Sequence, residues 1–118
     1  MAKVAIVVNG SEPKSVYPSF ILGTSGLAIG NEVMIFFCPA GSVPWCKKGE
    51  LEKVTMKGNP DMKDLVQKYV KLGGKLYLCE LALEAKDLKK EDIRTDTEII
   101  GATEFMSKAS DATVTFSF

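Results

Sequence analysis

The spacing of apolar and polar positions predicts short strands that alternate with helices along the whole chain. Apolar runs that stop at Asn, Gly or Pro are typical of strands, and the continuous runs indicate strands buried on both faces. The predicted strands span residues 3–8, 31–38, 75–79, 98–100 and 112–116. Helical spacing predicts helices within residues 13–30, from residue 60 to the glycine pair at 73–74, over residues 80–85 and over residues 102–109, with a further turn at 89–93.

Two prolines determine where the first two helices are expected to begin. Pro18 is tolerated if the first helix starts near Ser15, because the first turn of a helix needs no N–H donor. Asn59 followed by Pro60 has the pattern of an N-cap and a first helical residue, so the second helix is expected to start there. Residues 39–58, before this helix, have no clean period and predict a long irregular connection.

This order of elements predicts an α/β fold. We expect a three-layer α/β/α sandwich around a mostly parallel sheet of about five strands, with right-handed crossovers. The length of 118 residues predicts a single domain over residues 1–118. The last strand alternates apolar with polar residues, which predicts a place at the edge of the sheet.

Composition excludes several kinds of chemistry. The chain has three cysteines and no histidine, with fifteen basic and fifteen acidic side chains. Without an imidazole there can be no Ser-His-Asp or Cys-His catalysis, and zero net charge argues against a nucleic-acid module. The cysteine spacing matches no structural zinc pattern, so neither a metal nor a cofactor is expected. No run suits a membrane span or a signal peptide, and a cytoplasmic protein without a membrane partner is expected.

Four groups of residues follow predicted strands, and ligands of open α/β sheets gather at the carboxyl ends of strands. The groups are Asn9-Gly10-Ser11, Cys38-Pro39, Cys79-Glu80 and Gly101-Ala102-Thr103. Cys79 is the leading catalytic candidate, because a strand-to-helix junction offers free N–H groups and a helix dipole that favour a nucleophilic thiolate. A small buried packing residue also suits this position, and both readings stay open. Asn9-Gly10-Ser11 lacks a phosphate-loop pattern and is a weak candidate for anion binding.

The other two cysteines rank below Cys79. Cys38 ends an apolar run and is interpreted as a packing residue. Cys46 lies in the irregular connection, just before Lys47-Lys48, where it could be a second activated thiol or an unreactive loop residue; both remain open. The neighbouring Trp45 is expected to anchor this connection on the core rather than to contact a partner.

The segment around Cys79 resembles a known protein family. Residues 73–83 read Gly-Gly-Lys-Leu-Tyr-Leu-Cys-Glu-Leu-Ala-Leu, and residues 88–93 read Leu-Lys-Lys-Glu-Asp-Ile. A strand led by glycine that delivers a cysteine to a helix start, followed by such a Glu-Asp segment, resembles the DsrE/DsrF-like (DsrEFH) sulfur-relay family. The likeness extends to residues 30–37 and to the helix after Asn59-Pro60, and so covers most of the chain.

The resemblance implies a sulfur carrier or sulfurtransferase, although whether the chain is itself an enzyme stays open. In such a protein, Cys79 would hold a persulfide or thiosulfonate sulfur and pass it to an acceptor thiol. The resemblance also implies a homo-oligomer, a trimer or hexamer, and a TusA-like sulfur carrier protein as partner. It gives a role to Cys79 alone among the three cysteines.

Two other functions remain as alternatives. One is a non-catalytic oligomeric module that binds a nucleotide or a small anion at the carboxyl ends of the strands. The other is a thiol–disulfide redox protein that pairs Cys79 with Cys38 or Cys46, which requires Cα atoms within about 7 Å of each other.

Overall fold

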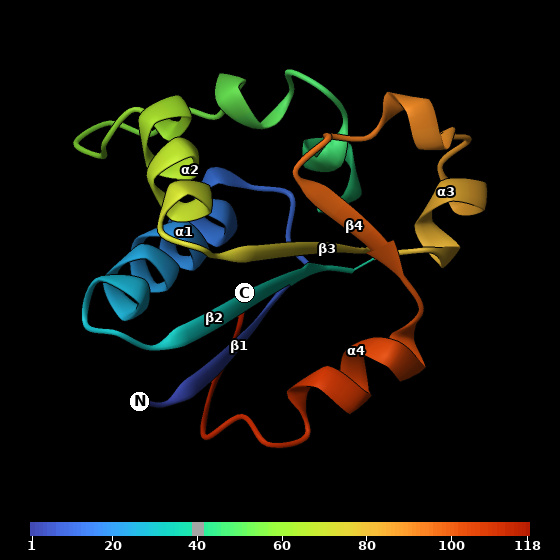
Figure 1. Cartoon of the computed structure of the whole chain (residues 1–118). Helices are drawn as coiled ribbons and strands as arrows, with labels where there is room; N and C mark the ends of the chain where they lie inside the picture. The colour runs from blue at the N-terminus through green and yellow to red at the C-terminus, as the bar shows by residue number, and fades with distance from the viewer. Residues whose placement is uncertain (39–41) are drawn as a thin grey trace.

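The predicted strands form one parallel sheet. The computed structural model describes residues 1–38 and 42–118, and every pair of neighbouring strands in its sheet is parallel, in the order β4-β3-β2-β1-β5 (Figure 1). The strands are β1 (Lys3–Val8), β2 (Glu32–Phe37), β3 (Lys75–Cys79), β4 (Thr97–Ile100) and β5 (Val114–Ser117). The predicted sheet is confirmed, with β5 at an edge. Because the strands are parallel, their carboxyl ends all lie at the same end of the sheet, which we call the carboxyl edge.

Helices cover both faces of this sheet, which confirms the α/β/α sandwich. The helices are α1 (Pro13–Ala28), α2 (Met62–Lys71), α3 (Leu81–Ala85) and α4 (Ala102–Ala109), with 3-10 turns η1 (Val43–Cys46), η2 (Leu51–Lys53) and η3 (Lys90–Asp92). Helices α1 and α2 lie on one face, and α4 lies on the other (Figure 1). Among the described residues, none of the helices is both long and apolar enough to cross a membrane.

The predicted start of the first helix is wrong. Helix α1 begins at Pro13, which occupies the first turn, so Pro18 lies inside the helix. A proline inside a helix leaves the carbonyl four residues earlier without its usual N–H donor. That carbonyl belongs to Lys14, an exposed residue, so water can replace the missing donor.

The second helix also starts later than predicted. Its N-cap is Asp61 rather than Asn59, because the Asp61 carboxylate accepts a hydrogen bond from the backbone N–H of Lys63 at 3.4 Å. The Pro60 carbonyl, which the prediction placed inside the helix, instead accepts a hydrogen bond from the Tyr17 hydroxyl at 3.0 Å. The helix therefore begins after the charged cap Asp61 and not after Asn59, as the Asn-Pro pattern had predicted.

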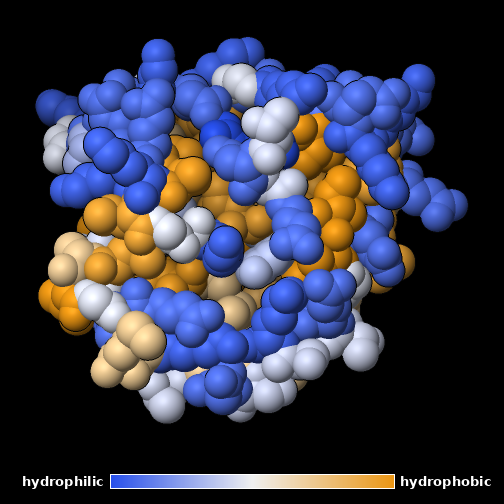
Figure 2. All heavy atoms as spheres, in the orientation of Figure 1, coloured by the Kyte–Doolittle hydropathy of each residue, from blue (hydrophilic) through white to orange (hydrophobic). Residues whose placement is uncertain are grey.

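The sheet separates two hydrophobic clusters of unequal size. The larger cluster lies between the sheet and helices α1 and α2, and it includes Phe20, Phe37 and Tyr69. The smaller cluster lies between the sheet and α4, and its buried members are Ala5, Met34, Phe36, Tyr77, Cys79, Ile100 and Phe105. On the face shown in Figure 2, hydrophobic side chains lie across the middle of the view, with hydrophilic side chains above and below them.

The connection from β2 to α2 is irregular, as predicted, but its ends are well anchored. Turns η1 and η2 carry the buried side chains of Val43, Cys46 and Leu51. The Trp45 ring packs against the larger cluster, and its indole N–H donates to the Ser11 carbonyl at 2.8 Å. This confirms that Trp45 is an anchor. Residues 39–41, which belong to the same predicted connection, lie outside the described residues.

Candidate functional site at the carboxyl edge of the sheet

Cys79 is the last residue of β3 and lies at the carboxyl edge of the sheet. On the neighbouring strand β4, Cys79 lies opposite Ile100, which is also the last residue of its strand. The Cys79 side chain belongs to the smaller cluster beneath α4 and is 2% exposed in the single chain. The sequence therefore predicts the place of Cys79 in the fold correctly, and the role of its thiol stays a prediction.

Cys38 lies beside Cys79, a proximity that the sequence left open. Strands β2 and β3 pair in parallel with Phe37 opposite Leu78, so the next residues are Cys38, which directly follows β2, and Cys79, the last residue of β3. The Cys38 side chain is half-buried and packs against the same cluster as Cys79. Burial raises the pKa of the Cys38 thiol, and the charge of Cys79 raises it further. All three cysteines are free thiols.

The positions two residues before each cysteine show which face of the sheet the thiols share. The Phe36 ring of β2 stacks on Phe105 of α4, with ring centroids 4.2 Å apart and planes 9° from parallel. The Tyr77 ring of β3 lies under the Lys108 ammonium of α4, with 5.6 Å between the nitrogen and the ring centroid. Since side chains alternate along a strand, Cys38 and Cys79 face α4 as well.

The helix that was expected to stabilise a Cys79 thiolate is short. Helix α3 has five residues, and the N–H of its N-cap residue, Glu80, donates to the Ile100 carbonyl at 2.8 Å. Helix α4, with eight residues, starts at the same edge, immediately after its N-cap Gly101. Glycine has no side chain to cap the helix, so the first N–H groups of α4 and its dipole offer a partial positive charge next to the end of β4.

The contribution of α4 could not be seen in the sequence. Residues 98–100 and 102–109 are correctly predicted as a strand and a helix, but nothing in them states that β4 pairs with β3 and so places Gly101 near Cys79. The Glu80 carboxylate lies here too, because a methyl group added to Gly101 would come within 3.0 Å of one of its oxygens. The edge thus combines two thiols, one helix start and one carboxylate.

Cys46 lies apart from this pair. It ends η1, is fully buried in the larger cluster, and so is separated from Cys79 by the sheet. Burial raises its pKa well above the ordinary range of a thiol, and the nearby Arg94 only partly offsets this effect. The predicted irregular loop is here an ordered turn, and a second reactive thiol at Cys46 stays a prediction that this placement disfavours.

The first predicted strand end offers little to an anion. The backbone N–H groups of Asn9 and Gly10 both donate to the Phe118 carbonyl, at 2.7 and 3.0 Å. The Ser11 carbonyl accepts the indole N–H of Trp45. These donors are therefore engaged within the chain, which agrees with the weak anion signal of Asn9-Gly10-Ser11.

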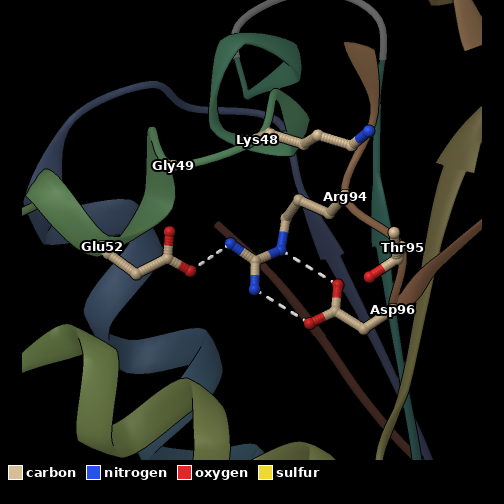
Figure 3. Close-up of a pocket in the computed structure, with 6 residues that line it drawn as sticks. All are labelled: Lys48, Gly49, Glu52, Arg94, Thr95 and Asp96. Carbon is tan, nitrogen blue, oxygen red and sulfur yellow. Dashed lines mark hydrogen bonds and ion pairs between the residues drawn. The ribbon is translucent and has the colours of Figure 1, made fainter. Parts of the chain in front are cut away.

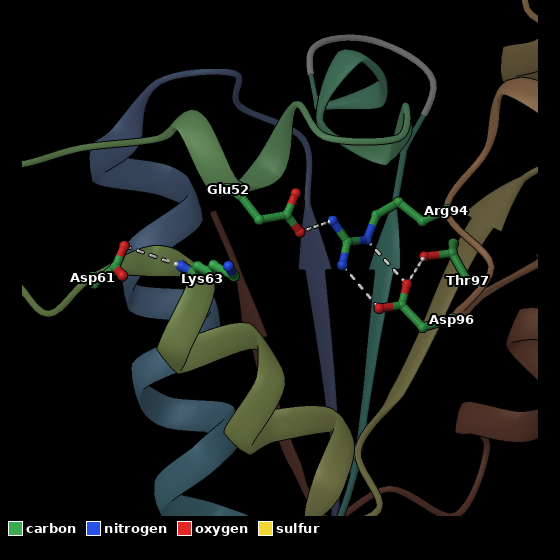
Figure 4. Close-up of polar contacts among 6 residues, drawn as sticks. All are labelled: Glu52, Asp61, Lys63, Arg94, Asp96 and Thr97. Carbon is green, nitrogen blue, oxygen red and sulfur yellow. Dashed lines mark hydrogen bonds and ion pairs between the residues drawn. The ribbon is translucent and has the colours of Figure 1, made fainter.

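A polar pocket of about 210 Å³ lies beside Arg94, before β4. Its lining residues are Lys48, Gly49, Glu52, Arg94, Thr95 and Asp96 (Figure 3). The Arg94 guanidinium donates two hydrogen bonds to Asp96, at 3.0 and 2.8 Å, and another to Glu52 (Figure 4). Two carboxylates thus already occupy the guanidinium, which makes Arg94 a structural tie between η2 and β4 rather than an anion site.

The sequence matches the DsrE/DsrF-like family over residues 2–118. The chain belongs to this family. The family is related to sulfur relay, and the match confirms the resemblance carried by the segment around Cys79. The uncharacterized protein MJ0760 of Methanocaldococcus jannaschii is 29% identical over 94 residues. That alignment covers 80% of this chain and 34% of the relative, so the chain spans about a third of that protein.

Solved structures share the fold of this DsrE/DsrF-like chain. The ychN protein of E. coli is similar with a TM-score of 0.79 and 16% identity, over 100% of both chains. The protein MTH1491 of Methanobacterium thermoautotrophicum is similar with a TM-score of 0.73 and 8% identity, over 98% of this chain and 97% of the other. At such low identities, these likenesses establish the fold alone.

Proposed function

We propose that this protein is a sulfur carrier or sulfurtransferase that holds a sulfur atom on Cys79 and passes it to an acceptor thiol. The observation that carries the proposal is the place of Cys79, at the carboxyl end of β3 in a DsrE/DsrF-like chain, with the start of α4 at the same edge. Histidine is absent from the sequence, and thiolate chemistry needs no imidazole base.

The reaction consists of two thiol exchanges. The Cys79 thiolate attacks the outer sulfur of a donor persulfide, forming a Cys79 persulfide and releasing the donor thiolate. An acceptor thiolate then attacks the outer sulfur of that persulfide, and Cys79 leaves as the thiolate. With thiosulfate as donor, sulfite leaves instead, and with an organic thiosulfonate a sulfinate leaves. The N–H groups at the start of α4, which follows the strand paired with β3, are donors at this edge that would favour the anionic sulfur.

The proposal places the protein in the cytoplasm, where thiols stay reduced.

The proposal also includes assembly with further copies of the chain. Helix α4 covers β2 and β3 but leaves β5 exposed on the same face, beside a pocket of about 340 Å³ lined by Ala5, Val7, Phe105, Met106, Ala109, Thr115, Phe116 and Ser117. Parallel sheets are normally covered on both faces, and a second copy would cover this one.

The pocket at Arg94 and the first strand end do not favour the alternative of a nucleotide- or anion-binding module. The Arg94 guanidinium is engaged by Glu52 and Asp96, and the N–H groups of Asn9 and Gly10 are engaged by the Phe118 carbonyl. The alternative makes a separate prediction, since binding of a nucleotide or of phosphate would persist when Cys79 is replaced. Isothermal titration of wild type and Cys79→Ser with ATP and with phosphate tests it.

Sulfur loading tests the proposed function directly. The reduced protein is incubated with a low-molecular-weight persulfide, thiosulfate or tetrathionate, freed from excess donor and weighed by mass spectrometry. Weighed at once after a persulfide or thiosulfate donor is removed, wild type and Cys46→Ala should carry one added sulfur atom. With tetrathionate, which loses thiosulfate when a thiolate attacks it, they should carry an added thiosulfonate group. Cys79→Ser should carry neither. Peptide mapping assigns the added sulfur to a residue.

A further inference from the structure

Cys38 and Cys79 form a pair of neighbouring thiols on one face of the sheet. Adjacent strands of a sheet lie about 4.8 Å apart. Disulfides join residues whose Cα atoms are roughly 4.4–6.8 Å apart. The register that sets Phe37 opposite Leu78 therefore brings the two backbones to a separation that a disulfide can bridge.

The backbone of Cys38 is held in place although the residue follows the last residue of β2. Its N–H donates to the Val8 carbonyl at 3.0 Å, which continues the pairing of β1 with β2. Its carbonyl lies 3.3 Å from the buried Ser42 hydroxyl, which also donates to Val8. Hydrogen bonds to β1 and to Ser42 thus hold the backbone of Cys38 in place.

The two thiols differ in exposure. Cys79 is almost fully buried, and Cys38 is half-buried at the same edge. Cys46, the third thiol, lies in the cluster on the other side of the sheet and cannot reach either of them. The sheet itself therefore selects which two of the three cysteines can react with one another.

We infer that Cys38 is a resolving thiol, which releases the sulfur held on Cys79 as hydrosulfide and leaves a Cys38–Cys79 disulfide. The Cys38 thiolate, its proton lost to solvent, attacks the inner sulfur of the Cys79 persulfide. A bond forms between the two cysteine sulfurs, and the bond to the outer sulfur breaks. The outer sulfur leaves with the electron pair of the broken bond as HS⁻.

No outside oxidant enters this step. The Cys38 sulfur is oxidised from the thiol to the disulfide level, while the outer sulfur of the persulfide is reduced to sulfide. A dithiol reductant then returns both cysteines to thiols. The step rests on the proposed function, because it begins with a persulfide on Cys79. It adds a second outcome to that function, release of sulfide in place of transfer to an acceptor.

The first arm of the test follows the loaded protein after the donor is removed. In wild type we expect loss of the added sulfur, release of sulfide, and a product two hydrogens lighter than the reduced protein. Peptide mapping should show residues 38 and 79 joined. In Cys38→Ser and in Cys38→Ala we expect loss of both the sulfide release and the lighter product. Cys46→Ala is the matched control and should behave as wild type. Equal persulfide decay in all four proteins would overturn the inference.

The second arm needs no sulfur donor and so separates this inference from the proposed function. The reduced protein is oxidised with diamide and mapped under non-reducing conditions. A disulfide within one chain between Cys38 and Cys79 supports the pair even where persulfide loading fails. Loading of Cys79 without any such disulfide in either arm overturns the resolving role and leaves the proposed function standing.

Discussion

At the scale of single residues, the environment of each cysteine determines what its thiol can do. Cys46 is enclosed by apolar side chains on one side of the sheet, whereas Cys38 and Cys79 share the other side with α4. Cys46 therefore serves as a packing residue, whereas Cys38 and Cys79 lie at the carboxyl edge of the sheet, where chemistry is expected. The three thiols are distinguished by how deeply each is buried and by which residues the strand pairing places beside it.

The pKa of Cys38 gives a prediction at this scale. Burial raises this pKa first, and the charge of Cys79 adds to it. A raised pKa lowers the fraction of reactive thiolate at a given pH, so Cys38 should react slowly with iodoacetamide near neutral pH. Removing the second cause in Cys79→Ala should lower the pKa and shift the pH profile of Cys38 alkylation to lower pH. An unchanged profile would mean that the two thiols do not interact.

At the scale of elements, the packing of α2 on the sheet depends on one close approach. The Tyr69 hydroxyl donates to the Lys75 carbonyl at 2.8 Å and lies 3.4 Å from the Val33 carbonyl, joining α2 to β3 and β2. The Tyr69 ring lies directly over Gly74, where an added methyl group would come within 2.4 Å of it. Gly74, which lies between α2 and β3, thus makes room for the ring.

We predict that Gly74→Ala lowers the free energy of unfolding by about 1–3 kcal/mol, because the methyl group must displace the buried Tyr69 ring. Urea denaturation followed by circular dichroism measures this difference. The exposed Ser25→Ala in α1 is the matched control and should change stability little. Equal stability of the two variants would contradict the packing described for α2.

The tie between η2 and β4 gives a second prediction for elements. The Arg94 side chain is 10% exposed and binds Glu52 and Asp96. We expect Arg94→Met to lower the free energy of unfolding by roughly 1–3 kcal/mol, since both carboxylates lose their partner. Arg94→Lys should lower it less, because lysine keeps the charge but not the two-pronged geometry. Sulfur loading at Cys79 should survive in both variants, and its loss would show that Arg94 belongs to the functional site.

Most elements follow from local sequence, whereas the site depends on how they pair. The apolar runs predict all five strands. The predicted starts of α1 and α2 were wrong, because α1 begins at Pro13 and includes Pro18, and because Asp61 rather than Asn59 caps α2. Local patterns also point to Cys79 as the end of a strand. They cannot state that β2 and β3 are neighbours in register, which is what joins Cys38 to Cys79. They likewise cannot place the start of α4 at the same edge, because strand order is set by packing over the whole chain.

At the scale of the whole molecule, the two faces of the sheet are unequally covered. Helices α1 and α2 bury one face, and the short α4 leaves part of the other face to solvent. Met106 of α4 is 62% exposed and lines the pocket beside β5. This asymmetry is what a chain that assembles with copies of itself would need.

We predict that the purified protein forms a homo-oligomer through this open face. Light scattering after gel filtration should give a mass that is a multiple of 12.8 kDa. Met106→Glu and Thr115→Glu place a charge on the face and should reduce that mass toward a single chain. Met56→Glu changes an exposed methionine elsewhere and should leave it unchanged. A single-chain mass for wild type would contradict the prediction.

Whether Cys79 carries sulfur is best tested by the mass of the intact protein directly after incubation with a persulfide donor. We predict one additional sulfur atom, located on Cys79 by peptide mapping, removed by a dithiol reductant and absent from Cys79→Ser. A protein that gains no sulfur from persulfide, thiosulfate or tetrathionate, either as wild type or as Cys38→Ser, or a Cys79→Ser variant that loads as wild type does, would contradict it.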